Sequence, residues 1–194
     1  MVGLAVPVTA SYIMCAVIAA PALIKLGVPD YAAHMFIFYY AVLSEVSPPT
    51  ALSPFAAATL TRADPYVTTL QSWKYALPAF LVPFIFVLDP IGAGLLLEFP
   101  KGVTWGSVIW VTIGAAAGVV ALAFAAQGHI TRPLGIGARI VCFVAGVSLM
   151  FPDLVDDWVG GTMAARLIGI AMLGTVIAYE LNRSRQAVPS RPPI

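Results

Sequence analysis

The sequence predicts an all-α polytopic membrane protein, and two observations predict it. Of 194 residues, 60% are hydrophobic and only 10% are charged, with a mean hydropathy of +0.94. Soluble domains average about 45–50% apolar and about 25% charged residues, so a soluble fold lacks the polar side chains to cover itself. The second observation is that apolar segments recur along the whole chain. A secreted disulfide scaffold and a disordered chain are excluded, and a formal net charge of +1 gives no field that recruits nucleic acid.

The first two apolar segments, residues 8–26 and 31–61, each contain prolines at positions that interrupt a helix. These are Pro7 and Pro21 for the first segment, and Pro48, Pro49 and Pro54 for the second. At membrane depth, a helix break is tolerated only where protein or a water-filled cavity satisfies the freed backbone groups. The sequence therefore predicts a re-entrant hairpin arm followed by a proline-broken helix, and function is expected there.

About four further transmembrane helices are predicted after the broken helix. A span needs about 20 apolar residues, which residues 103–127 and 161–181 supply alone. Residues 66–88 qualify if their polar start lies at the membrane interface. Residues 134–151 qualify only if the Arg139 side chain extends outward to the interface. Within two of these spans, small-residue pairs predict close helix packing; they are Gly114 with Gly118, and Ala165 with Gly169.

This pattern divides the chain into three parts: a transport-type half at 1–90, additional helices at 91–182, and a disordered tail at 183–194. Alternating the spans backwards from a cytoplasmic C-terminus places seven of the ten Lys and Arg residues inside. That bias predicts a C-terminus in the cytoplasm. The inside residues are Arg62, Lys74, Arg132, Arg139, Arg183, Arg185 and Arg191.

The segment from Ser44 to Thr50 interrupts an otherwise apolar run. Pro48 cannot donate a hydrogen bond to the Ser44 carbonyl, and Pro49 cannot donate to the Glu45 carbonyl. Pro54 likewise frees the carbonyl of Thr50. Ser47 and Pro48 are predicted to be the N-cap and first residue of a second half-helix.

Such a break offers two kinds of binding group. The end of the first half-helix presents carbonyl oxygens, which with Ser44, Glu45, Ser47 and Thr50 suit Na⁺. The start of the second, after Val46, presents N–H groups that suit a carboxylate. The alternative is a plain proline kink repaired by neighbouring helices, which leaves Glu45 unexplained.

Glu45 needs an explanation because a carboxylate at a helix centre in the membrane costs roughly 2.5–3.5 kcal/mol. It could coordinate an ion, carry a proton, or form structural hydrogen bonds to the broken backbone. No Lys or Arg of the chain lies at its predicted depth, and the choice between Na⁺ and H⁺ stays open.

The opening segment has a similar character. Pro7 frees the carbonyl of Gly3, and Thr9 supplies a hydroxyl, so a hairpin tip is predicted near Gly3. The other arm of that hairpin would precede Met1, and the chain is therefore expected to be the C-terminal part of a longer protein.

At these residues the sequence resembles the large membrane subunit of TRAP (tripartite ATP-independent periplasmic) transporters, specifically the fused permease of the TAXI type. The resemblance extends to about residue 90 and is most specific at the Ser-Glu-x-Ser-Pro-Pro core. The matching runs are Pro7–Tyr12, Ala32–His34, Val42–Pro49, Ala56–Ala58, Ala63–Pro65, Val82–Val87 and Asp89–Pro90. Ala5 departs from the family, which often has a second glycine there.

The resemblance implies an elevator-type secondary transporter in the bacterial inner membrane that takes up a small organic anion. It implies an ion gradient, usually of Na⁺, as the driving force. The implied partners are a periplasmic binding protein, the remaining N-terminal part or subunit of the permease, and the lipid bilayer. By carry-over, Gly3 to Thr9 would form the hairpin tip and Ser44 to Thr50 the broken-helix half of the site.

Two alternatives stand beside this interpretation. The chain could be a truncated permease fragment or an assembly subunit that does not transport. An intramembrane enzyme using Ser44 or Glu45 would need a general base nearby, and the sequence offers none. It also contains no zinc-protease, nucleophile-elbow or phosphate-loop motif. Cys15 and Cys142 lack the paired spacing of a metal or redox site. Taken together, these absences mean that neither an enzyme nor a cofactor is predicted.

Overall fold

The computed structural model describes residues 7–48, 51–89, 91–97, 103–130 and 132–186. Within these residues every regular element is a helix, which confirms the all-α prediction. The chain forms two compact units, Met1–Ile113 and Gly114–Ile194, and each is described by itself.

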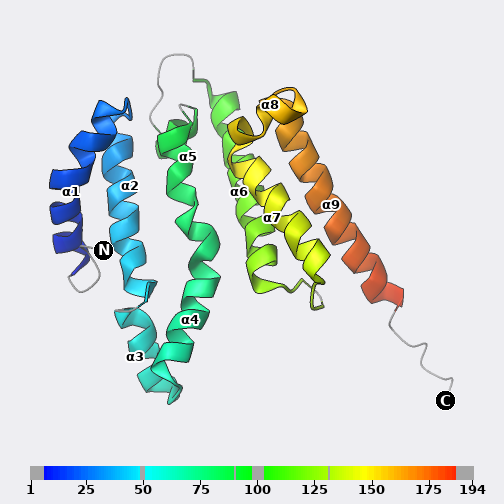
Figure 1. Ribbon diagram of the computed structural model, residues 1–194, viewed down its shortest axis with the longest axis horizontal. Coiled ribbons are helices and arrows are strands. Elements are labelled where there is room, and N and C mark those ends of the chain that lie inside the picture. Colours follow the sequence, from blue (N-terminus) through cyan, green and yellow to red (C-terminus); the bar gives the residue numbers. More distant parts are fainter. Residues whose placement is uncertain (1–6, 49–50, 90, 98–102, 131, 187–194) are drawn as a thin grey trace. The chain divides into compact units, whose positions relative to one another are not determined.

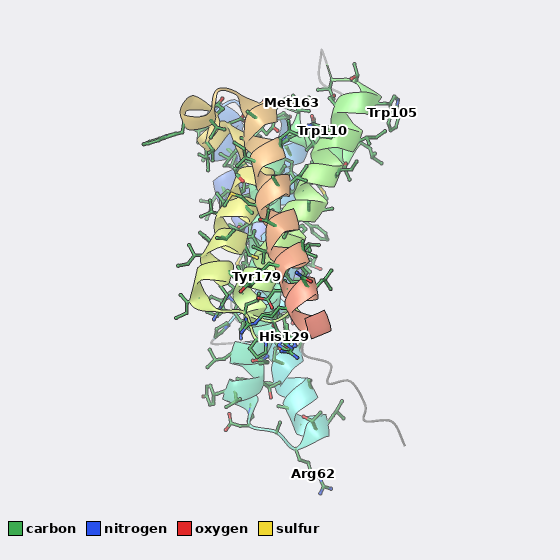
Figure 2. All side chains as sticks on the ribbon, turned by 90° about the vertical axis from the view of Figure 1, so that its right-hand side faces the viewer. Arg62, Trp105, Trp110, His129, Met163 and Tyr179 are labelled. Atoms are coloured by element: carbon green, nitrogen blue, oxygen red, sulfur yellow. The ribbon has the colours of Figure 1, made fainter. Side chains whose placement is uncertain are left out.

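The first unit is a series of helices connected by short turns (Figure 1). Its elements are α1 (Val8–Lys25), α2 (Asp30–Leu43), η1 (Ser44–Val46), α3 (Leu52–Thr61), α4 (Pro65–Ala76), η2 (Leu77–Phe80), α5 (Val82–Leu88), η3 (Gly92–Leu96) and the start of α6 (Trp105–Gln127). Helices α1 and α2 pack side by side, and α3 and α4 form a hairpin. Arg62 lies at the tip of that hairpin (Figure 2), where it ends α3 with a left-handed backbone at φ 55°.

Helix α1 continues through Pro21, so the predicted interruption at that residue is wrong. One missing backbone hydrogen bond does not end the helix. The helix ends instead at Lys25, and Gly27, two residues further on, adopts a φ of +93° that a side chain would disfavour. There the Gly27 amide donates to the Ile24 carbonyl at 2.9 Å, and the Val28 amide donates to the Leu23 carbonyl at 3.2 Å. This pair of hydrogen bonds is the Schellman motif, and it turns the chain sharply into α2.

The second unit contains the C-terminal part of α6, α7 (Ile136–Met150), η4 (Pro152–Leu154), α8 (Asp156–Val159) and α9 (Thr162–Gln186). Helices α7 and α9 pack closely, as the small-residue pairs predict. A Cβ built on Gly169 would lie 2.8 Å from the Ser148 hydroxyl, and one on Gly118 would lie 3.1 Å from the Gly146 carbonyl oxygen. Figure 2 shows Met163 at one end of α9 and Tyr179 toward the other.

Four helices among the described residues are long and apolar enough to cross a membrane. They are Val8–Lys25, Pro65–Leu88, Trp105–Gln127 and Thr162–Arg183. The spans predicted at 103–127 and 161–181 are confirmed, and so is 66–88. Helix α7 is apolar but shorter. These helices make the protein membrane-embedded.

The side chain of Arg139, which is exposed near the start of α7, reaches the end of the neighbouring helix α6, and a position at the membrane interface stays a prediction. Its Nε donates to the Ala125 carbonyl at 2.9 Å, and its Nη2 donates to the Ala126 carbonyl at 3.4 Å. These are orphan carbonyls of the last turn of α6, where the helix dipole also favours a cation. Arg139 therefore caps the neighbouring helix.

The described part of α9 reaches Gln186, so residues 183–186 of the predicted tail are helical. Residues 187–194 lie outside the described residues. The division at residue 90 and the cytoplasmic position of the C-terminus stay predictions.

Candidate functional site

The proline-broken helix predicted at Ser44–Thr50 is present. Helix α2 tightens into the 3-10 turn η1 at Ser44, and the chain leaves helical geometry at Ser47, with φ −93° and ψ 129°. The second half-helix, α3, begins at Leu52. Of the predicted site residues, Gly3, Pro49 and Thr50 lie outside the described residues.

The start of the second half-helix differs from the prediction. Ala51, not Ser47, is the N-cap of α3, and no side chain caps it. The reason is that the Ser47 amide turns back and donates to the Ser44 carbonyl at 3.2 Å. Ser47 thus closes the first half-helix and does not open the second. Pro54 falls in the first turn of α3, where its missing N–H has no helical acceptor.

The same bond means that the Ser44 carbonyl is not free, contrary to the prediction. Pro48 has no N–H to donate to this carbonyl, and in the 3-10 turn the amide of Ser47, one position earlier, donates instead. Glu45 has no such rescue, because Pro48 and Pro49 occupy both the i+3 and i+4 positions. Among the described residues, no backbone amide donates to the Glu45 carbonyl. Within the described part of the chain, the Glu45 carbonyl oxygen is therefore left without a backbone donor at the break.

Two hydroxyl groups flank this carbonyl. Ser44 Oγ donates to the Ala41 carbonyl at 2.7 Å, and Ser47 Oγ donates to the Leu43 carbonyl at 3.0 Å. Each hydroxyl donates its hydrogen bond to a carbonyl of the preceding turn. The lone pairs of its oxygen therefore remain available to accept a hydrogen bond or to coordinate a cation.

The Glu45 carboxylate belongs to the same turn and is half-buried. Within the described part of the chain, no side chain forms an ion pair or hydrogen bond with it. The carboxylate and carbonyl of Glu45 and the two hydroxyl oxygens thus come from a segment of four residues, Ser44–Ser47. These oxygen ligands are those preferred by hard cations.

A neighbouring helix break supports this one, and sequence reasoning missed it. The span Pro65–Leu88 is interrupted by η2, which contains Pro78 and precedes Pro83. Pro83 cannot donate to the Phe80 carbonyl, and the Phe84 amide donates to Leu81. The Tyr40 hydroxyl, on the last turns of α2, donates to the Phe80 carbonyl instead, at 2.5 Å.

Aromatic packing reinforces this junction. The rings of Phe36, Tyr40, Phe80 and Phe84 contact one another with centroids 4.9–6.2 Å apart. Tyr40 lies about one helical turn before Ser44. The end of α2, just before the break, is therefore packed against this second interruption. The two prolines in the span 66–88 were the sequence feature that could have revealed it.

The predicted hairpin residues are only partly described. Pro7 is the N-cap of α1, and its carbonyl accepts from the Ser11 amide at 3.0 Å. Thr9 is exposed in the first turn of α1. No hydrogen bond among the described residues joins Pro7 or Thr9 to the break. Helix α1 is instead connected to α2 by the Tyr12 hydroxyl and His34 Nδ1, 2.9 Å apart.

A buried acid in the second unit was also missed. Glu180 of α9 is 1% exposed, and its Oε2 has no hydrogen-bond partner among the residues that the structure describes. Its Oε1 lies 4.0 Å from Arg183, at the limit of an ion pair. An acid six positions before the end of a long apolar helix was visible in the sequence, but its burial depends on packing.

Comparison with known families finds a match for the N-terminal part of the chain. Residues 1–91 match the family described as "Tripartite ATP-independent periplasmic transporter, DctM component". The predicted resemblance to a TRAP large permease is thereby confirmed over this stretch, which includes the break at Ser44–Pro48. The TAXI type stays a prediction. Comparisons with curated proteins and with solved structures found no match.

Proposed function

Because residues 1–91 match the family of the TRAP DctM component, we propose that the chain is part of an ion-coupled secondary transporter. Its cargo is a small organic anion delivered by a periplasmic binding protein, and its movement is of the elevator type. The observation that carries the proposal is the helix break at Ser44–Pro48, which lies inside the matched stretch and leaves the Glu45 carbonyl without a helical donor.

In this proposal the break binds the coupling ion. The Glu45 carbonyl and carboxylate, with the hydroxyl oxygens of Ser44, Ser47 and Thr50, form a hard oxygen site for Na⁺. Glu45 also permits H⁺ as the coupling ion, because a carboxylate can carry a proton. No other cofactor is needed.

The substrate carboxylate belongs at the N-terminus of the second half-helix. The free amides of the first turn of α3 and the positive end of its dipole favour an anion there. Since α3 begins at Leu52, the anion would lie against Leu52 and Ser53. The hairpin residues Gly3, Pro7 and Thr9 are proposed to complete the site from the other side.

The proposed assembly resides in the bacterial inner membrane with the C-terminus in the cytoplasm. It includes the binding protein and the remaining permease part or subunit. The four apolar helices support the membrane position. The positive-inside bias supports the orientation.

Sodium binding is testable without knowing the substrate. The full chain, in lipid nanodiscs, is titrated with NaCl against choline chloride at constant ionic strength while thermal unfolding is followed. We expect Na⁺ to raise the Tm of the wild type and of Pro21→Ala, which alters a proline inside a continuous helix. We expect Glu45→Gln and Pro48→Ala to lose most of this increase.

Transport requires the complete permease with its binding protein in proteoliposomes. Uptake of a panel of small carboxylates is measured under imposed Na⁺ or H⁺ gradients. Unchanged ion dependence in both Glu45→Gln and Pro48→Ala would refute the site. No uptake by the complete assembly would favour the alternative, a fragment or assembly subunit that does not transport.

A further inference from the structure

A cavity of about 190 Å³ lies in the first unit, away from the helix break. One wall is the turn between α1 and α2, including Leu26 and Gly27. The other is the last turn of α5, Phe86 to Leu88, followed by Asp89. Figure 1 shows that the α1–α2 turn and the end of α5 are at the same end of this unit.

The polar groups around this cavity are mainly acceptors. Asp89 is half-buried, and its Oδ1 accepts from the Ile91 amide at 2.7 Å. That bond holds the carboxylate over the end of α5. It also diverts the amide that a longer helix would direct to the Val87 carbonyl. The Phe86 carbonyl has no α-helical donor either, because residue 90 is proline.

The helix dipoles add to this negative character. Helices α1 and α5 both end at the cavity, so two negative dipole ends converge there. Helix α2 begins beside it, but Asp30 in the first turn offsets that positive end. Lys25, in the last turn of α1, is exposed and does not line the cavity.

The size and remaining walls decide which cation fits. Phe86 and Ala93 form a buried apolar floor, and the exposed Leu26 and Leu88 stand at the rim. The described residues contain no cluster of three metal-ligating side chains. A water molecule takes about 30 Å³ of liquid volume, so a bare ion would leave most of the cavity unfilled. An apolar stem ending in a cationic head matches both the floor and the acceptors.

We propose that this cavity binds a primary alkylammonium group, with Asp89 as its counter-ion. The apolar stem lies on Phe86 and Ala93, and the ammonium donates to the Asp89 carboxylate and to the carbonyls at the end of α5. Both adjoining spans, Val8–Lys25 and Pro65–Leu88, end at the cavity. The site therefore lies at a membrane–water boundary, where a cation enters without crossing lipid. The group is either that of a free amine or that of a lysine on a docked protein.

The test uses n-butylammonium as the probe on the full chain in nanodiscs. Saturation-transfer NMR and thermal unfolding measure binding, with n-butanol as the neutral analogue and Na⁺ as the bare cation. Asp89→Asn removes the charge but keeps an oxygen for the Ile91 amide, so the turn is retained. Asp30→Asn is the matched control, because it removes an equal charge next to the cavity without lining it.

We expect butylammonium to bind the wild type and Asp30→Asn, with affinity at least about tenfold lower in Asp89→Asn, as loss of a charged hydrogen bond implies. We expect Val28→Lys, which places an ammonium in the cavity, to abolish the response. Equal binding to Asp89→Asn and wild type, or equal binding of butanol, would overturn the proposal.

A second measurement identifies the source of the ammonium and rests on the proposed function. If a lysine of the periplasmic binding protein supplies it, Asp89→Asn weakens association of that protein with the permease, whereas Asp30→Asn does not. If a free amine supplies it, association is unchanged while the butylammonium response is still lost. The Na⁺ response of the helix break is independent of both outcomes.

Discussion

The hydrogen bond from the Tyr40 hydroxyl to the Phe80 carbonyl gives the sharpest prediction about how the broken helix is held. Tyr40→Phe keeps the ring and its aromatic neighbours but removes the donor. Pro83 prevents a helical replacement, and the Phe84 amide is already bonded to Leu81. The Phe80 carbonyl is then left unsatisfied in a part-buried position.

An unsatisfied buried polar group costs about 1–3 kcal/mol. For a chain of this size, about 1 kcal/mol shifts the Tm by roughly 2–4 °C, so a decrease of about 2–12 °C is expected. Tyr39→Phe is the matched control, because Tyr39 is equally half-buried and its hydroxyl has no partner among the described residues. Thermal unfolding in nanodiscs, followed by far-ultraviolet circular dichroism, measures both variants.

A double-mutant cycle isolates the cause. Pro83→Ala restores an N–H that can donate to the Phe80 carbonyl, so Tyr40→Phe should cost less in that background. We expect a coupling energy of at least about 0.5 kcal/mol, the lower end for residues in contact. Equal Tm values for Tyr40→Phe and Tyr39→Phe, or no coupling to Pro83, would refute the reasoning.

Two further predictions concern the second unit. Gly146→Ala should destabilise it by about 1–3 kcal/mol, because the new Cβ would lie 2.6 Å from Leu122 Cγ. In the control Gly137→Ala, on the same helix, the new Cβ meets nothing within 4 Å, so this variant should be neutral or stabilising. Thermal unfolding compares the two variants, and equal effects would contradict the packing argument. Glu180→Met should raise stability by about 1–4 kcal/mol, since it removes a buried acid whose one ion pair among the described residues, to Arg183, is long and partly exposed. A lower Tm would show that a partner holds this carboxylate.

The sequence predicted what local chemistry decides. The runs at 103–127 and 161–181 are uninterrupted and apolar, so their composition alone predicts two spans, which correspond to α6 and α9. The break after Leu43 was predictable because prolines act on the carbonyls three and four positions earlier. The prolines themselves determine where α2 must end.

What the sequence did not predict depends on competition between partners. Whether Ser47 opens the second half-helix or closes the first is decided by its amide, which bonds back to Ser44. The hydrogen bond of Arg139 was not predicted because its acceptor belongs to another helix. Tyr40 was not named because its acceptor lies 40 residues away. Patterns within one segment contain no information about such tertiary choices.

The fate of the freed carbonyls distinguishes a functional break from a plain proline kink. In a kink repaired by its neighbours, each freed carbonyl finds a donor within the fold, as Ser44 does from Ser47 and Phe80 does from Tyr40. The Glu45 carbonyl is different, because prolines occupy both helical donor positions and no described residue replaces them. Its own carboxylate, an acceptor when ionised, cannot satisfy it. Among the described residues this turn gathers acceptors and lacks donors, and that asymmetry supports the proposal of ion coupling over structural repair.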